Sequence, residues 1–464
     1  DPLMQKIYDY LVIGSGPGGA VVGYQLNKSG ADVAILEAGE FFRKDTFPRN
    51  DADVSAQLYW GGGIEFDKPA KMAFLRARVV GGTTIVNQAL VDRFDDIALR
   101  DWKAQSGIDF FTPEAMEPHY DKLAENVSVH EFSRSQFNRN AELYTEACDR
   151  LGYRWGFLHR AQADCAGDRG NDCIACLGGC HRDSKQSSMA TYIQRGEKEG
   201  LTVIPNTEVN QIEDRPDHVL VYATQKGTRV QFRTRKLIVA GGSFGTTQLL
   251  LQSGLKEKLP ALGRYFSSHP QFMNFGVFDE PVNAHKGYFQ TVASKDPNFR
   301  AQGFKLEIVF APPVSIAMLF KDYGRDHQQI MRDYTRINCV EVAVRDENVG
   351  EIRINNKGRL EIEKPLTDQD KVRREAGLQT VHNIMSDAGA KRVLHAPMYF
   401  GLHLMGGAVM GTDANKSVVG PDFKLHTSDN IYVCDSSLFP NAPGINPSLT
   451  IYALSQRLSE QLTK

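Results

Sequence analysis

The sequence predicts an α/β protein, with a Rossmann-like domain and an inserted α+β domain built on an antiparallel sheet. Two observations lead to this fold class. Within the first 40 residues, an apolar strand, a glycine-rich turn, a helix and a second strand follow one another. Between about residues 270 and 400, strand-like segments recur, and the last 60 residues then return to glycine-rich sequence. The second sheet is therefore expected to interrupt the first domain.

The charge balance excludes several classes of partner. The chain has 464 residues, 54 basic against 56 acidic side chains, a net charge of −2 and a pI near 6.7. A nucleic-acid-binding protein usually has a pI above about 9, and proteins that bind membrane surfaces carry polybasic runs. No apolar run approaches the ~20 residues that span a bilayer. We therefore expect a globular protein with no nucleic-acid partner and no membrane span.

The first element is a strand at residues 8–13 that ends in Gly14-Ser15-Gly16-Pro17-Gly18-Gly19. A helix closed by Gly30 and a second strand ending at Glu37 follow. In such a unit, Gly14 and Gly16 allow a tight turn and the approach of a pyrophosphate to the helix amides, while Gly19 permits close packing of the helix on the strand. Glu37 stands where a carboxylate accepts hydrogen bonds from ribose hydroxyls, so the pattern predicts a dinucleotide site.

The later elements follow from local pattern. Residues 98–164 have mixed helical spacing and are expected to cover the fold. Residues 201–242 alternate like a small meander that returns to the first sheet. Asn356-Lys357-Gly358 is a hairpin turn of the second sheet, and the helix after residue 368 is expected to stop at Gly389.

Four of the seven cysteines lie close together, at Cys165, Cys173, Cys176 and Cys180. An odd number bunched in this way does not resemble the disulfide framework of a secreted protein. Thiolates at this spacing can converge on one metal centre, and iron-sulfur clusters need three or four of them. Free or disulfide-linked cysteines are the alternative, because C-x2-C is a short motif.

The amino terminus bears on localisation. Met4 stands just before the first strand, so we take Asp1-Pro2-Leu3 as an artificial addition and Met4 as the native start. This leaves no room for an export signal, and we expect a cytoplasmic protein. A trimmed exported form is the alternative.

Five segments together carry a resemblance to a known family. They are GSGPGG with Glu37-Ala38-Gly39, residues 76–93, residues 185–193, residues 237–254, and the two carboxyl-terminal stretches HLMGGAVMGTDANKSVVG and NIYVCDSSLFPNAPGINPSLTIYAL. In this order, the chain resembles the glucose-methanol-choline (GMC) flavin oxidoreductases. The resemblance implies a Rossmann-like FAD-binding domain at 4–97, 185–268 and 401–464, a helical cover with the cysteine-rich segment at 98–184, and a substrate domain at 269–400.

The resemblance also assigns cofactor-binding residues. It implies that Gly14, Gly16 and Gly19 hold the pyrophosphate of FAD, Glu37 the ribose and Val209 the adenine, with Gly241 near that end. Gly82, Thr83 and Asn87 are expected beside the flavin ring, and Asp435, Asn446 and Pro447 under the ribityl chain and the ring. For Gly82 and Asp435, the alternative is a turn and a capping carboxylate. No histidine lies in residues 76–88, where some relatives attach flavin, so we expect non-covalent FAD.

The family oxidises an alcohol by moving the hydroxyl proton to a base and a hydride to flavin N5. His403 matches the family's base, and Asn446 matches its partner; imidazole titrates near pH 6.5, whereas an amide can only orient the substrate. Other histidines, such as His269, are expected to be structural hydrogen bonders.

Some sugar dehydrogenases of this family carry a three-iron cluster on a similar cysteine-rich segment. This similarity favours a sugar or other polyol as substrate, and electron transfer through an iron-sulfur cluster to an external acceptor such as a protein. The alternatives are an oxidase that uses oxygen, a non-redox lyase or photoenzyme of the same family, and a non-catalytic FAD-binding protein. The joint presence of His403 and Asn446 argues against the last.

Overall fold

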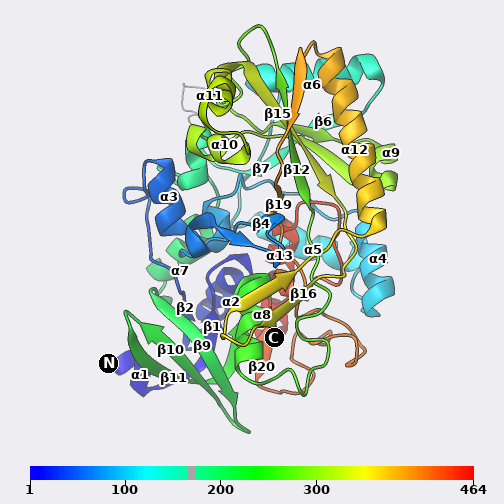
Figure 1. The fold of residues 1–464 in the computed structure, drawn as a ribbon. Helices are drawn as coiled ribbons and strands as arrows, with labels where there is room; N and C mark the ends of the chain where they lie inside the picture. Colours follow the sequence, from blue (N-terminus) through cyan, green and yellow to red (C-terminus); the bar gives the residue numbers. More distant parts are fainter. Residues whose placement is uncertain (166, 168–172) are drawn as a thin grey trace.

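The computed structural model describes residues 1–165, residue 167 and residues 173–464, so part of the cysteine-rich segment lies outside the described residues. Figure 1 shows two large sheets at opposite ends of the molecule, with the amino-terminal part of the chain and the carboxyl-terminal helix reaching the region between them. Among the described residues, no helix is both long and apolar enough to span a bilayer.

The first sheet is built around the predicted amino-terminal unit. Strand β1 (Ile7–Ile13) leads through the glycine turn into α2 (Pro17–Lys28), and β2 (Val33–Leu36) pairs parallel with β1. The strand order is β8-β2-β1-β11-β10-β9, and β20 pairs with the end of β11. The other strands are β8 (Thr202–Ile204), β9 (Thr207–Asp214), β10 (Val219–Gln225), β11 (Thr228–Val239) and β20 (Ile431–Val433). The predicted meander and the return of the carboxyl-terminal segment to this sheet are confirmed.

The second sheet is mainly antiparallel, in the order β3-β4-β19-β12-β15-β14-β13-β6, and β18 also pairs with β12. Its strands are β3 (Glu65–Phe66), β4 (Met72–Phe74), β6 (Trp155–Phe157), β12 (Gln271–Val277), β13 (Val292–Ser294), β14 (Phe304–Ile308), β15 (Ile337–Val344), β18 (Arg392–His395) and β19 (Tyr399–Gly401). Three of these strands, β3, β4 and β6, come from outside the expected 269–400 segment. The second sheet is therefore built from segments that lie far apart in the sequence, including parts of the chain on both sides of the first sheet's strands β8 to β11.

The expected hairpin forms, but it stands apart from the second sheet. Strands β16 (Glu351–Ile354) and β17 (Leu360–Glu363) pair only with each other. The turn between them is held by Asn355, whose side-chain oxygen accepts hydrogen bonds from the backbone N–H groups of Lys357 and Arg359. Gly358 has a φ of +73°, which a glycine adopts without strain.

Helix α12 (Asp368–Asp387) covers one face of the second sheet (Figure 1). Thr367 begins it with a capping box, because its hydroxyl accepts from the N–H of Asp370 and the Asp370 carboxylate accepts from the N–H of Thr367. Gly389, with a φ of +92°, follows its end as expected. The helix buries Val381, Ile384 and Met385 against the sheet.

The remaining helices divide between the two sheets. Helices α4 and α5 pack with the core of the first sheet, whereas α6 packs with the second. Helix α13 lies against α2, where Ser455 donates a hydrogen bond of 2.6 Å to the carbonyl of Gly18. Their bounds are α1 (Pro2–Gln5), α3 (Asp51–Leu58), α4 (Asp96–Ser106), α5 (Pro113–Leu123), α6 (Arg139–Leu151), α7 (Gln194–Lys198), α8 (Gly242–Gln252), α9 (Pro297–Gln302), α10 (Pro313–Leu319), α11 (Gly324–Arg332) and α13 (Ser448–Leu462). Two short strands, β5 (Val129–Glu131) and β7 (His159–Ala161), form a separate ribbon.

Candidate functional site

A cavity of about 1600 Å³ extends from the glycine turn of the first sheet to the strands of the second. It brings together residues from across the sequence. Of the residues expected at the cofactor or the reaction, those that line it are Gly14, Gly16, Glu37, Gly82, Thr83, Asn87, Val209, Gly241, His403, Asp435, Asn446 and Pro447. Gly19 does not line it, because this glycine lies where α2 packs on the turn.

The glycines of the first turn differ in what a side chain at each position would meet. A Cβ on Gly14 would lie 2.1 Å from the carbonyl oxygen of Ala240, and one on Gly19 would lie 2.0 Å from the carbonyl oxygen of Gly14. These two positions are closed by the protein's own backbone. A Cβ on Gly16 would meet no protein atom within 4 Å, although Gly16 lines the cavity and has an ordinary φ of −66°. The space above Gly16 is therefore open towards the cavity.

Glu37 holds the turn in place through its carboxylate. It accepts hydrogen bonds from the N–H (3.2 Å) and hydroxyl (2.6 Å) of Ser15 and from the N–H of Gly39 (2.9 Å). Ser15 in turn accepts from the N–H of Gly81, and Ser188 donates to the carbonyl of Ser15. Burial raises the pKa of the Glu37 carboxyl. These serine contacts connect the glycine turn to the loop that precedes Gly82.

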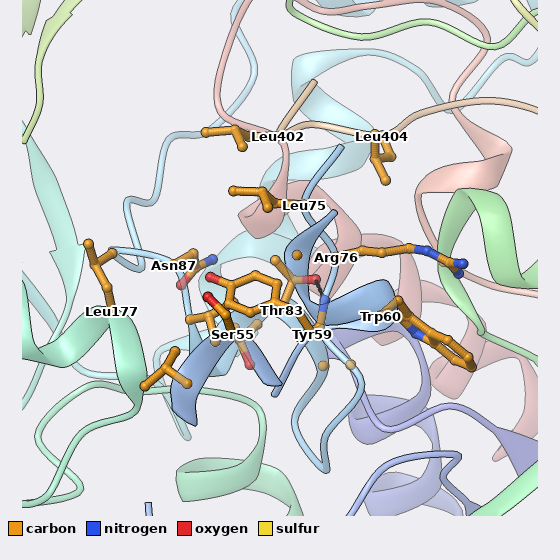
Figure 2. A pocket seen from close by; sticks show the side chains of 18 of the residues that line it. Ser55, Tyr59, Trp60, Leu75, Arg76, Thr83, Asn87, Leu177, Leu402 and Leu404 are labelled. Atoms are coloured by element: carbon orange, nitrogen blue, oxygen red, sulfur yellow. Dashed lines mark hydrogen bonds between the residues drawn. The ribbon is translucent and has the colours of Figure 1, made fainter. Parts of the chain in front are cut away.

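The segment expected beside the flavin ring forms the middle of the cavity wall. Gly82 begins a short 3-10 helix with a φ of +57°, and a Cβ there would lie 3.0 Å from the Cα of Gly16. Figure 2 shows Thr83 and Asn87 next to Tyr59, which follows α3. The Thr83 hydroxyl accepts from the N–H of Ala77, and Asn87 accepts from the N–H of Ala89. Gly82 thus combines a turn with a close approach to the first glycine loop.

The carboxyl-terminal residues lie at element ends that face the same cavity. Asp435 accepts hydrogen bonds from the N–H of Gly242 (3.0 Å), the hydroxyl of Thr246 (2.5 Å) and the N–H of Ser437 (2.8 Å). This carboxylate caps two helical segments, as the capping alternative predicted, and it also lines the cavity. Pro447 precedes α13, Gly241 precedes α8, and Val209 lies in β9.

At the other end of the cavity, His403 contacts a second histidine. Nδ1 of His403 lies 2.7 Å from Nδ1 of His269, and Nε2 of His269 accepts a hydrogen bond of 2.8 Å from the N–H of Gly444. Burial lowers the pKa of His403 to about 4 and holds the pKa of His269 well below its usual value. Both rings are therefore neutral at physiological pH.

Asn446 is fixed by two carboxylates. Its amide nitrogen lies 3.2 Å from Oδ2 of Asp92 and 3.2 Å from Oε1 of Glu307. The ammonium of Lys305 lies 2.9 Å from the same Oε1 of Glu307. Because both amide hydrogens are used in this way, the amide oxygen of Asn446 is the polar atom left for a ligand.

Glu307 faces a second buried acid. Glu307 in β14 and Glu341 in β15 are directly paired in the sheet, and both line the cavity. Burial and the neighbouring charge of Glu307 raise the pKa of Glu341 to about 8, while a hydrogen bond from Gln271 and the charge of Lys305 act in the opposite direction. At neutral pH Glu341 therefore largely keeps its proton.

The rest of this end is apolar. In Figure 2, Leu75 and Leu402 lie above Tyr59, and Leu177 lies to the left of it; all three line the cavity. The wall beyond them is made of side chains from β12 to α10, namely Phe275, Phe289, Val309, Phe310, Ile316 and Leu319. Helix α10 is tied to α3 across the cavity by hydrogen bonds from the N–H and hydroxyl of Ser315 to Asp51.

The four clustered cysteines lie beside this cavity but form two pairs. All four are free cysteines; the side chain of Cys165 is hydrogen-bonded to that of Cys173, and the side chain of Cys176 to that of Cys180. The guanidinium of Arg160 donates to the Cys173 sulfur at 3.2 Å. In the part of the chain that the structure describes, no group of three or more Cys, His, Asp or Glu side chains could hold a metal ion. The expected iron-sulfur cluster is therefore not supported.

The family match covers both carboxyl- and amino-terminal parts of this arrangement. Residues 9–271 and residues 347–455 match the amino- and carboxyl-terminal profiles described as GMC oxidoreductase. The chain belongs to the GMC oxidoreductase family. The resemblance noted in the sequence is thus confirmed, and the α/β architecture with several sheets is the fold of that family.

Other GMC proteins are similar over nearly the whole chain. An uncharacterized GMC-type oxidoreductase of Mycobacterium tuberculosis, Rv0492c, is 27% identical over 98% of this chain and 75% of its own length. The long-chain-alcohol oxidase FAO4B of Arabidopsis thaliana is 25% identical over 98% of this chain and 67% of its own. Pyridoxine 4-oxidase from Mesorbium loti has the same fold, with a TM-score of 0.77, 15% identity and coverage of 98% and 99%.

In this GMC oxidoreductase, the sequence did not indicate several residues that line the cavity or lie beside it near His403. Glu307 and Glu341 occur in alternating strand sequence, where a charged residue usually faces solvent. His269 was expected to be a structural hydrogen bonder, and nothing in the sequence placed it beside His403. Ser15 and Ser188, which hold the glycine turn, lie within two of the quoted family segments, and that position was the available clue.

Proposed function

We propose that the protein uses FAD to oxidise an alcohol to the carbonyl compound. The observation that carries this proposal is the single cavity with a dinucleotide-type turn at one end and His403 with Asn446 at the other. Such a cavity can hold the adenine half of a dinucleotide at the first sheet and an alcohol at the second. Bound FAD would supply the acceptor for the hydride that leaves the alcohol carbon.

The residues present fit FAD. The open space above Gly16 meets the start of α2, where backbone N–H groups favour a pyrophosphate. Two further cavity-lining glycines, Gly242 and Gly245 at the start of α8, would also place a Cβ in open space. Glu37 and Val209 line the part of the cavity where the adenosine half of FAD would lie. The fit of FAD to these residues needs no covalent link between the protein and the flavin. We propose that FAD binds non-covalently.

The substrate that fits the cavity is an alcohol with an apolar chain or ring. Polar side chains gather around His403, Asn446, Glu307 and Glu341, while the remaining wall towards α10 is apolar. A sugar would bring several hydroxyl groups against that wall without hydrogen-bonding partners, which is costly. The preference for a sugar rested on cluster-bearing relatives, and the cysteine arrangement removes that reason. The name of the Arabidopsis relative and that of the pyridoxine oxidase are consistent with such alcohols.

The electron acceptor is proposed to be external, either a protein or oxygen. The sequence favours a dehydrogenase that passes electrons to an external acceptor such as a protein, and two of the three named similar proteins are oxidases, which favours oxygen as the alternative. Reduced enzyme mixed with air-saturated buffer distinguishes them: rapid reoxidation with hydrogen peroxide release supports oxygen, whereas slow reoxidation that an artificial acceptor accelerates supports a dehydrogenase.

The function is tested by mixing the FAD-loaded protein with a panel of alcohols and sugars without oxygen. Loss of the absorbance of oxidised flavin in the dark, with formation of the matching aldehyde or ketone, is the expected result. The strongest response is expected from alcohols with apolar substituents. No bleaching with any alcohol, together with a non-redox change of substrate, would instead support a lyase or photoenzyme.

A further inference from the structure

The cysteine segment beside the cavity surrounds two buried positive charges. Arg160 is 3% exposed, and its guanidinium donates to the sulfur of Cys173 at 3.2 Å. Lys185 is also 3% exposed, and its ammonium donates to three backbone carbonyl oxygens. A buried cation is costly unless a negative charge lies nearby. Ionised cysteines supply that charge, because Cys165 favours the charged form of Arg160 and Cys180 favours that of Lys185.

Cys180 is the member of its pair that ionises. Its sulfur accepts hydrogen bonds from the thiol of Cys176 and from the backbone N–H groups of Lys185 and Arg182. These bonds lower the pKa of Cys180 to about 4, whereas the contact with Cys180 and burial raise the pKa of Cys176. Cys180 is partly exposed and Cys176 is buried. A partly exposed thiolate next to a second thiol is the arrangement that reacts with peroxides and then forms a disulfide.

The three isolated cysteines lack this arrangement. Cys148, Cys339 and Cys434 are at most 2% exposed, and burial raises the pKa of each thiol. They are therefore protonated at neutral pH and shielded from solutes. Reactivity towards an oxidant is thus expected in the cluster and not at these three positions.

The turn between Cys176 and Cys180 is part of the cavity wall. Leu177 lies between the two cysteines and lines the cavity (Figure 2). The carbonyl of Cys176 accepts from Lys185, which also holds the carbonyl of Asn87 in the opposite part of the wall. A disulfide brings its two sulfurs to about 2.05 Å and so tightens the turn. This change moves wall residues and the Cys176 carbonyl, and it removes the thiolate that compensates Lys185.

We propose that hydrogen peroxide oxidises Cys180 and that Cys176 then joins it in a disulfide, which weakens FAD binding and slows alcohol oxidation. Formation of the disulfide is independent of the proposed function, whereas its effect on alcohol oxidation rests on that function. If oxygen is the electron acceptor, the enzyme produces this oxidant itself.

The oxidation takes place in two steps. The Cys180 thiolate attacks one peroxide oxygen, so that a sulfur–oxygen bond forms, the oxygen–oxygen bond breaks, and the second oxygen leaves as water with a proton from solvent. The Cys176 sulfur then attacks the sulfur of Cys180, and the hydroxyl group leaves as water with the Cys176 proton. The two cysteines lose two electrons, and one peroxide is reduced to two waters.

The chemical test maps the cysteines of the purified protein before and after peroxide treatment. The tryptic peptide 170–182 contains Cys173, Cys176 and Cys180. All three should be alkylated in the untreated, unfolded protein. After treatment, Cys176 and Cys180 should resist alkylation, and the peptide should lose two hydrogens. In Cys176→Ser, the sulfenic acid should remain on Cys180 and be captured by dimedone. Free Cys176 and Cys180 after treatment, with or without a bridge from Cys173 to Cys165, would overturn the proposal.

The effect on the cavity is measured after catalase has removed the peroxide. We expect the affinity of the FAD-free protein for FAD to fall about tenfold, as for the loss of one hydrogen bond to a charged group. Reduction of the bound flavin by an alcohol without oxygen should slow as well. Dithiothreitol should reverse both changes, because the disulfide is reducible.

Two variants separate the bridge from general oxidative damage. Cys180→Ser cannot form the disulfide, so its FAD affinity should be the same before and after treatment. Cys148→Ala, which removes a buried cysteine outside the cluster, should respond as the parent does. A full response in Cys180→Ser, or a disulfide that leaves FAD affinity unchanged, would overturn the effect on the cavity. If the disulfide forms and FAD affinity falls, but no alcohol reduces the parent enzyme, the cysteine pair stands and the proposed function falls.

Discussion

Gly16 differs from its neighbours in what a side chain there would meet. Because no protein atom lies within 4 Å of a Cβ at this position, substitution should leave the fold intact and act only on a ligand. We expect Gly16→Val to abolish FAD binding, measured by the flavin released on heating. The thermal stability of the FAD-free protein should change no more than it does for a typical surface substitution.

The contrast is Gly18→Ala, where the Cβ would lie 2.0 Å from the carbonyl oxygen of Cys434. That variant should lose the folded protein itself. Full FAD occupancy in Gly16→Val would show that the open space above this residue is not the pyrophosphate site.

Glu341 provides a test of electrostatics that is independent of catalysis. Its pKa is raised to about 8 by burial and by Glu307, so between about pH 5 and pH 8 the folded protein holds a proton that the unfolded chain has lost. Raising the pH through this window therefore costs the parent stability, by up to about 1.4 kcal/mol per pH unit. In the Glu341→Gln variant this side chain does not titrate, so the variant does not lose stability in this way as the pH rises.

We expect the free energy of unfolding of Glu341→Gln, relative to the parent, to increase from pH 5 to pH 8 in urea titrations. The groups that face Glu341 are Glu307, Lys305 and Gln271, and none of them is changed in this comparison. A difference that does not vary with pH would mean that Glu341 titrates normally in the folded protein.

At the level of elements, one buried lysine joins the cysteine segment to the wall of the cavity. The ammonium of Lys185, which is 3% exposed, donates to the carbonyls of Ile85 (2.7 Å), Asn87 (2.7 Å) and Cys176 (2.6 Å). Removing it leaves three buried acceptors without this donor. We expect Lys185→Met to lower the free energy of unfolding by about 3 kcal/mol or more and to weaken FAD binding, because Asn87 lines the cavity.

The control for this change is Lys391→Met. The Lys391 side chain is half exposed and pairs with an exposed aspartate, so its loss should change stability by less than about 0.5 kcal/mol. Equal effects of the two substitutions on the free energy of unfolding would contradict a structural role for the three hydrogen bonds of Lys185.

Elements with strong local signals were predictable from the sequence. The unit from β1 to β2 has buried strands of four or more residues and a glycine turn, and α12 has a capping box at Thr367 and a stop at Gly389. Strands β3, β4 and β6 were not predictable, because segments of two or three residues carry too few positions for an alternating pattern. Their place in the second sheet is decided by long-range pairing.

At the scale of the whole molecule, the site depends on the same long-range pairing. Family segments identified the residues around the dinucleotide-type turn, since each lies in a continuous stretch. The end of the cavity near His403 was only partly predictable. His403 and Asn446 lie in such stretches, whereas Glu307 and Glu341 come from the antiparallel sheet and His269 from the loop before β12, and these three meet the first two only after folding. A hydrogen-bond direction such as that from Gly444 to His269 has no sequence signature.

The shared second sheet leads to a prediction about unfolding. Large proteins with separate domains often unfold in several steps. Here β3, β4 and β6 connect the second sheet to segments that also build the first, and Ser315 of α10 bonds Asp51 of α3 across the cavity. Neither sheet can lose its strands without disturbing the other. We therefore expect one cooperative transition in denaturant.

Two tryptophans report on the two ends of the molecule. Trp102 is fully buried in the core of the first sheet, and Trp155 lies in β6 of the second. With Trp60 also replaced, a variant that keeps only one of them should show, in its fluorescence, the same midpoint as the far-ultraviolet circular dichroism of that same variant. Excess FAD should shift both midpoints upward together, because a ligand bound only by the folded state stabilises everything that unfolds with its site. A Trp155 transition that precedes the Trp102 transition and ignores FAD would mean that the second sheet unfolds as an independent domain.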